Sequence, residues 1–170
     1  MDTRNGVARL PDATIAANED EHDIALQRYV MRLGLDFFVR LATACSELFE
    51  GNLLTGLIFV AIAQSSVQHL NKPLRLNPSA VDGVFPDELR RPVSVLGLAQ
   101  FLGLPYETTR RHVNRLVELG YVNKVGARGV ITPSEVMRRP EVDRLVAANF
   151  SSVRQFVAGL RNGASELLEA

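Results

Sequence analysis

The sequence predicts a mainly helical protein that contains one small β-hairpin. Apolar residues recur at spacings of three and four through residues 24–49 and 142–160, which is the pattern of amphipathic helices. Leu, Val and Ala are abundant, Trp is absent and aromatic residues make up 6% of the chain, a composition that favours helices over a β-sandwich. Residues 121–132 combine β-branched residues with a glycine-bounded tip, and this segment predicts the hairpin.

Composition indicates a soluble protein of one or two small domains, since the chain has 170 residues of which 46% are apolar. The single cysteine, Cys45, cannot form an internal disulfide, and the N-terminal residues lack the apolar core of a signal peptide. The longest apolar run, Leu53–Ala63, is shorter than the roughly 20 residues that a membrane span needs. We therefore expect a cytoplasmic protein that does not insert into a membrane.

The N-terminal part of the chain divides into a tail and a first helix. Residues 1–19 lack periodicity, so we expect a disordered tail. A helix is predicted from about Asp20, because the acidic residues that begin there suit the positive end of a helix dipole. Gly51-Asn52 is expected to end this helix.

A second helix is predicted from Leu53 to about Leu70, and its first half is apolar nearly all round. Such a helix must be covered on every side. We therefore expect residues 20–72 to form an N-terminal helical dimerisation region in which a partner subunit packs against Leu53–Ile62.

The segments on either side of residues 91–133 are predicted to be a linker and a pair of C-terminal helices. Residues 73–90 lie in a proline-rich stretch without a period, so they are expected to form a linker with a short turn at Asp87–Arg90. Residues 134–163 are expected to form C-terminal helices that pack on the N-terminal region and share in the dimer interface. The longer of these helices begins at Pro140, a residue suited to the first helical position, and stops at Gly163.

Residues 91–133 contain the signals of a helix, a sharp turn and a second helix. Ser94 is a good N-cap for a short helix, and Gly103 permits the left-handed conformation that ends it. Pro105 suits the first turn of the next helix, which Gly120 ends. The hairpin follows, and a short strand near Pro92-Val93 is expected to join it.

These parts, in this order, are those of a winged helix-turn-helix, with a three-helical core and a small β-hairpin wing. We expect this module at residues 91–133, flanked by the N- and C-terminal dimerisation helices. Residues 88–128 carry seven basic and three acidic side chains in a chain of zero net charge. A basic segment in a neutral chain is typical of a module that binds a polyanion.

The same segment resembles winged-helix transcriptional regulators of the IclR, GntR and MarR type. The residues that carry the resemblance are Leu98-Ala99, Leu102-Gly103-Leu104-Pro105, Thr108, Arg110, Leu116 and Gly120-Tyr121-Val122. It covers about a quarter of the chain and identifies the module rather than one family. One departure is Thr109, which stands where such regulators usually have a small apolar residue.

The resemblance implies that the second helix reads the DNA major groove and that the wing contacts the flanking backbone or minor groove. Arginine can bind guanine through two hydrogen bonds, and asparagine can bind adenine in the same way. The predicted DNA-binding residues are Tyr106, Thr108, Thr109, Arg110, Arg111, Asn114, Arg115, Lys124 and Arg128. The predicted function is a sequence-specific regulator that binds double-stranded DNA as a homodimer.

Other interpretations stay open. The arginines of the second helix could simply solvate a surface helix, partly paired with Glu107 and Glu118. The winged helix could instead be a protein-interaction module. A third alternative is a ligand-gated regulator in which an apolar pocket of the N-terminal helices, near Phe37, Phe38, Phe49 and Phe59, binds a small-molecule effector, although plain core packing is the preferred interpretation of these rings.

No catalytic, cofactor or metal site is expected. The three histidines, His22, His69 and His112, are scattered, and no histidine or cysteine pair has the spacing of metal ligands. Phosphate-binding loops and nucleophile motifs are absent from the sequence. Cys45 lies on an apolar stripe and is expected to fill the core. We therefore expect that the protein is not an enzyme.

Overall fold

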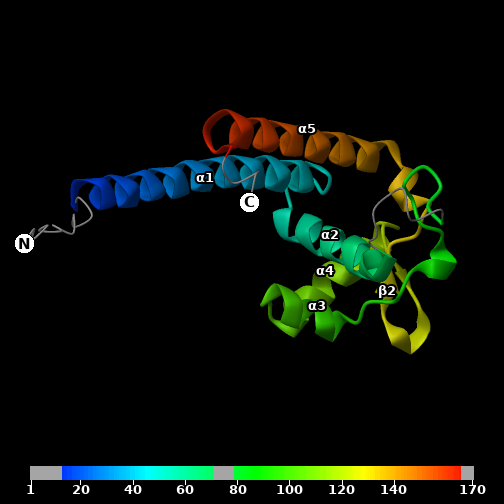
Figure 1. Cartoon of the computed structure of the whole chain (residues 1–170). Helices are drawn as coiled ribbons and strands as arrows, with labels where there is room; N and C mark the ends of the chain where they lie inside the picture. The colour runs from blue at the N-terminus through cyan, green and yellow to red at the C-terminus, as the bar shows by residue number, and fades with distance from the viewer. Residues whose placement is uncertain (1–12, 71–78, 166–170) are drawn as a thin grey trace, which may run out of the picture. The chain divides into compact units, whose positions relative to one another are not determined.

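A computed structural model describes residues 13–70 and 79–165 of the chain (Figure 1). This part is mainly helical and contains a small two-stranded antiparallel sheet, as the sequence predicts. The helices are α1 (Ala13–Glu47), α2 (Leu53–Val67), α3 (Val95–Leu102), α4 (Tyr106–Glu118) and α5 (Pro140–Gly163). The strands are β1 (Asn123–Lys124) and β2 (Val130–Ile131), and the short 3-10 helices are η1 (Gln68–Leu70), η3 (Asp87–Leu89), η4 (Gly126–Arg128) and η5 (Val136–Arg138).

Helix α1 begins at Ala13 and not near Asp20, so the last residues of the expected tail are helical. The segment from Ala13 contains three alanines within five residues. Alanine has the highest intrinsic helix propensity, and propensity leaves no periodic signal. The expected tail at residues 1–12 lies outside the described residues.

The chain forms two compact units, which are described separately: residues 1–37 with 154–170, and residues 38–153. In the first unit, α1 and the end of α5 pack closely. The rings of Phe37 and Phe156 lie 5.8 Å apart, and the Tyr29 hydroxyl donates a hydrogen bond to the Gly159 carbonyl at 3.0 Å. A side chain at Gly159 would collide with Leu33, so the helices approach closely here. The end of α5 therefore packs on α1 within this unit.

Helix α2 lies at the centre of the second unit and packs against α3, α4 and β2. Ile58, Phe59 and Ile62 are buried in the same cluster as Leu98 of α3 and Leu116 of α4. Figure 1 shows α2, α3, α4 and the hairpin gathered together. Helix α2 therefore shares one core with α3 and α4, although the sequence predicts it in a separate dimerisation region.

A partner subunit is not needed to cover Ile58, Phe59 and Ile62 of the expected intersubunit surface Leu53–Ile62, because the chain itself buries these side chains. At Gly56, an added Cβ would collide with the Cys45 carbonyl, so the end of α1 lies directly against α2. Phe59 packs against the rings of Phe49 and Tyr121, with centroids 5.5 Å apart in each pair. An all-round apolar helix requires cover but does not specify whether that cover comes from the same chain.

Helix α2 also extends into η1 as the span Leu53–Leu70, which is long and apolar enough to cross a membrane by length and composition alone. Its buried residues include Thr55 and Ser66 as well as apolar residues. Core helices pass the same test, and we interpret α2 as the central core helix of its unit.

The predicted cap and end of α3 are confirmed, whereas Pro105 lies just before α4 instead of in its first turn. The Ser94 hydroxyl accepts a hydrogen bond from the Gly97 amide at 3.0 Å and caps α3, which ends at Gly103 with a φ of 64°. Pro105 precedes the first residue of α4. The three residues between the helices, Gly103, Leu104 and Pro105, therefore produce the sharp turn that positions α4.

The hairpin is held in place by a third, single-residue strand. Val93 forms an antiparallel bridge with Val130 through reciprocal backbone hydrogen bonds of 2.8 and 2.9 Å. Gly129 has a φ of 131°, and a Cβ there would collide with the Val93 carbonyl. This confirms the short strand that the sequence predicts near Pro92-Val93. The predicted turn at Asp87–Arg90 is confirmed as η3.

Ile58 offers a test of the position of α2. Replacement by aspartate places an unpaired charge in a fully buried position, so Ile58→Asp is expected to lower the free energy of unfolding by about 4 kcal/mol or more in urea titrations followed by circular dichroism. The control Thr43→Asp, at an exposed position of α1, is expected to change it by less than about 1 kcal/mol. A stable Ile58→Asp protein that merely dissociates would restore the intersubunit interpretation.

Candidate nucleic-acid interface

Helix α4 has one buried and one exposed face. Thr109, Val113 and Leu116, spaced by four and three residues, are fully buried. Because α4 packs against both α2 and α3, this face is fixed by the core. The opposite face is polar and exposed, and it carries three arginines.

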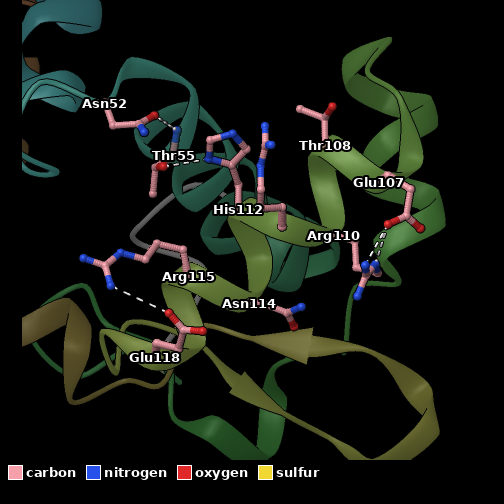
Figure 2. A pocket seen from close by; sticks show the side chains of 10 residues that line it. Asn52, Thr55, Glu107, Thr108, Arg110, His112, Asn114, Arg115 and Glu118 are labelled. Carbon is pink, nitrogen blue, oxygen red and sulfur yellow. Dashed lines mark hydrogen bonds and ion pairs between the residues drawn. The ribbon is translucent and has the colours of Figure 1, made fainter.

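An open hollow of about 680 Å³ follows the exposed face of α4 and reaches the beginning of α2 (Figure 2). Most of its lining comes from α4: Glu107, Thr108, Arg110, Arg111, His112, Asn114, Arg115 and Glu118. Asn52 and Thr55 complete it from the start of α2. The hollow is therefore lined by charged and amide side chains, which are the groups that contact phosphates and base edges.

The structure brings together five of the predicted DNA-binding residues in this hollow: Thr108, Arg110, Arg111, Asn114 and Arg115. Tyr106 is exposed at the first position of α4, and Lys124 and Arg128 are exposed on the hairpin. The prediction for Thr109 is wrong. This residue is fully buried, and its hydroxyl donates to the Pro105 carbonyl at 3.2 Å. Thr109 is buried because it lies on the apolar stripe of α4, although its side chain is polar.

Two arginines of α4 form ion pairs within the helix. Arg110 donates two hydrogen bonds to Glu107 Oε2, at 2.9 and 2.7 Å, and Arg115 Nη1 lies 3.7 Å from Glu118 Oε2. Both pairs are drawn in Figure 2. The pairing that the surface-helix alternative requires is thus present, and it reduces the positive charge of the face.

Arg111 differs from these two arginines. It lines the hollow, is exposed, and forms no ion pair with a described residue. Lys124 and Arg128 on the hairpin likewise form no ion pair within the described part of the chain. The three unneutralised cations therefore lie on α4 and on the hairpin.

Five lining residues were not predicted to bind DNA: Asn52, Thr55 and His112, besides the acidic Glu107 and Glu118. The Asn52 side chain caps α2 by accepting from the Thr55 amide at 3.0 Å, and Thr55 Oγ1 lies 2.8 Å from His112 Nδ1. This second hydrogen bond joins α2 to α4 through side chains. The sequence had no signal for it, since α2 was not assigned to the same module. Partial burial lowers the pKa of His112 from its ordinary value, and the nearby Arg111 lowers it further.

The other candidate sites contain fewer convergent groups. Among the described residues, no three His, Cys, Asp or Glu side chains gather as metal ligands. Cys45 is buried as expected, and burial raises the pKa of its thiol. Phe49 packs against Phe59 with their centroids 5.5 Å apart, while Phe38 is exposed. Core packing is therefore confirmed for two of the four phenylalanines that the effector-pocket alternative named.

Comparison with known proteins identifies no relatives. No protein-family model matches the chain, and neither a curated protein nor a solved structure matches it significantly. The assignment of a function therefore depends on the geometry and chemistry of the chain itself.

The lowered pKa of His112 predicts a pH dependence of stability. In the unfolded chain the His112 side chain binds a proton near pH 6.5, and in the folded chain it does so only at lower pH. The free energy of unfolding is therefore not reduced by this group above pH 6.5, and it decreases as the pH falls below that value. His112→Asn is expected to reduce this decrease in urea midpoints measured between pH 7.5 and 5. Identical profiles for His112→Asn and the parent would contradict this assignment.

Proposed function

We propose that this protein is a cytoplasmic, sequence-specific transcriptional regulator that binds double-stranded DNA as a homodimer. Its DNA-reading module would be a winged helix-turn-helix formed by α2, α3, α4 and the hairpin. The order of parts supports this: a helix, a bridging strand at Val93, two helices separated by a sharp turn, and a hairpin. In such a module the second helix of the turn, here α4, enters the major groove.

The observation that carries the proposal is the exposed face of α4, where Arg111, Asn114 and Arg115 lie together in an open hollow. These side chains have the donors and acceptors that distinguish base pairs in the major groove. Lys124 and Arg128 add positive charge on the hairpin, the position at which a wing contacts the DNA backbone.

The intrahelical ion pairs reduce the positive charge of this surface but do not prevent its arginines from binding DNA. All four partners are at least half exposed, and exposed pairs contribute only about 0–1 kcal/mol. A phosphate or a guanine edge can therefore replace Glu107 or Glu118 as the partner of an arginine at small cost. Arg111 requires no such exchange.

Exposed apolar residues on α1 support a homodimer. Ile24, Met31 and Leu35 recur along this helix with spacings of seven and four. The proposed dimer surface thus replaces α2 with α1. A helix-turn-helix protein that reads two half-sites requires two copies of the module.

A second candidate function is favoured by one observation on α3. Phe101 is 75% exposed and Leu96 is 56% exposed, which is unusual for large apolar side chains beside a proposed DNA surface. These residues would suit a protein partner better than DNA. This candidate predicts that Phe101→Ser abolishes partner binding and that the arginines of α4 are dispensable.

Arg111 gives the sharpest test of DNA reading. A preferred site is first selected from a random duplex pool, and affinity is then measured by fluorescence anisotropy at fixed salt. Arg111→Ala is expected to weaken binding to this site by about 1–3 kcal/mol and to relax preference at one base pair per half-site. Arg144→Ala removes an exposed arginine of α5 and is expected to change nothing.

The hairpin variants distinguish backbone contacts from base contacts. Lys124→Ala and Arg128→Ala are expected to weaken all sequences similarly and to reduce the salt slope by about one unit per lost phosphate contact. Glu118→Ala should leave affinity equal or slightly higher. Failure to bind any duplex at low salt, or full affinity after alanine replaces Arg110, Arg111 and Arg115 together, would overturn the proposal.

The dimer is tested by sedimentation. The parent protein is expected to be dimeric at tens of micromolar and to protect two DNA patches about 34 Å apart or a multiple of that distance. Leu35→Glu is expected to shift it to a monomer because it places a charge in the exposed apolar row of α1. Gln27→Glu, at an exposed polar position of the same helix, is the control. A monomeric parent would contradict the assignment.

A further inference from the structure

The unit of residues 38–153 contains a second cavity, which shares no lining residue with the candidate DNA interface. Its volume is about 420 Å³, within the range of small-molecule sites. The walls are mainly apolar and include Phe59 of α2, Phe85 of the segment before η3, Met137 of η5 and Leu145 of α5. The exposed polar residues Gln64 and Asn149 also line the cavity. The cavity is therefore an apolar recess that opens to solvent.

Among the described residues that line this apolar recess, one is charged: Arg90, whose side chain is only 3% exposed. Its Nη2 donates to the Phe85 carbonyl at 3.0 Å. Its Nε is buried and has no hydrogen-bond partner among the described residues. A buried guanidinium group with an unused N–H group is rare, because such donors are normally satisfied.

The nearest acidic group compensates Arg90 only in part. Asp87 Oδ1 lies 3.4 Å from Arg90 Nε without forming a hydrogen bond, and it accepts the Ser134 amide at 2.6 Å instead. The Asp87 side chain is 44% exposed, so solvent screens its charge. Burial lowers the pKa of Arg90; the charge of Asp87 opposes this shift, and the second positive charge of nearby Arg138 adds to it. The electrostatics of the recess therefore favour an additional anion.

We propose that this cavity binds a small organic carboxylate with an apolar body, whose carboxylate pairs with Arg90. A guanidinium fork matches a carboxylate geometrically, and the apolar walls match a hydrocarbon or aromatic body. A phosphorylated ligand fits less well, because a dianion would need several donors and the described lining residues supply one guanidinium group. The site is independent of α4, so its existence does not depend on DNA binding.

A purely structural role for Arg90 is the competing explanation, since its hydrogen bond to Phe85 closes the turn before η3. That role requires neither a cavity beside the guanidinium group nor apolar walls. This structural role also predicts that replacing Arg90 changes only the stability of the protein. The affinity for a ligand would then not depend on the charge of the ligand's head group.

The test is isothermal titration calorimetry of the full chain with two carboxylates, decanoate for a hydrocarbon body and 4-butylbenzoate for an aromatic body. Methyl decanoate and decylamine serve as the neutral and the cationic analogue of decanoate with the same chain length. At least one of the two carboxylates is expected to bind with a stoichiometry of one per chain. Each decanoate analogue should bind at least about tenfold more weakly than decanoate, as expected for the loss of a charged hydrogen bond. Failure of both carboxylates to bind, or equal affinity for decanoate and its ester, would overturn the proposal.

Three variants separate the site from a structural effect. Arg90→Met is expected to reduce carboxylate affinity at least about tenfold, while Arg91→Met, at the exposed neighbouring residue, should leave it unchanged. Ala63→Phe fills the cavity and retains Arg90, so it should abolish binding even if Arg90→Met does not fold. Undiminished binding in Ala63→Phe would place the ligand elsewhere and reject this site.

Discussion

The burial of α2 is the constraint on which the second unit depends. A helix whose first half is apolar on all sides has no face for water, so every neighbouring element is placed by the need to cover it. Helices α3 and α4 and strand β2 pack against it, and the end of α1 approaches closely enough that Gly56 has no room for a side chain. The polar face of α4 points outward because its apolar stripe must point toward α2. The candidate site is thus a consequence of the core.

Local signals predicted the parts of the fold well, because each is determined by a few neighbouring residues. Ser94 and Gly103 bound α3 through a side-chain cap and a left-handed backbone, and both are properties of a single residue. The place of α2 could not be predicted in the same way. Periodicity shows how much of a helix must be covered but not which chain covers it. Thr109 was misassigned because it is polar by residue type but lies on the buried stripe.

The candidate site was predicted where it depends on one helix and missed where it depends on two. The spacing of Arg111, Asn114 and Arg115 places them on one face of α4, and the structure brings them into one hollow. The contact between Thr55 and His112 joins residues 57 positions apart, and no local pattern contains that information. The partners of Arg110 and Arg115 were foreseen as an alternative because i, i+3 spacing brings such side chains together.

For the proposed DNA binding, the close contact at Gly129 has a consequence for the strength of association. Since Val93 and Val130 are joined by two backbone hydrogen bonds, and no side chain separates Gly129 from Val93, the base of the hairpin is anchored to the core. A loop that is ordered before it meets a partner loses less conformational entropy on binding. The positive charges of Lys124 and Arg128 are therefore carried by a preorganised support. A longer or less anchored hairpin with the same charges would bind with a larger entropic penalty.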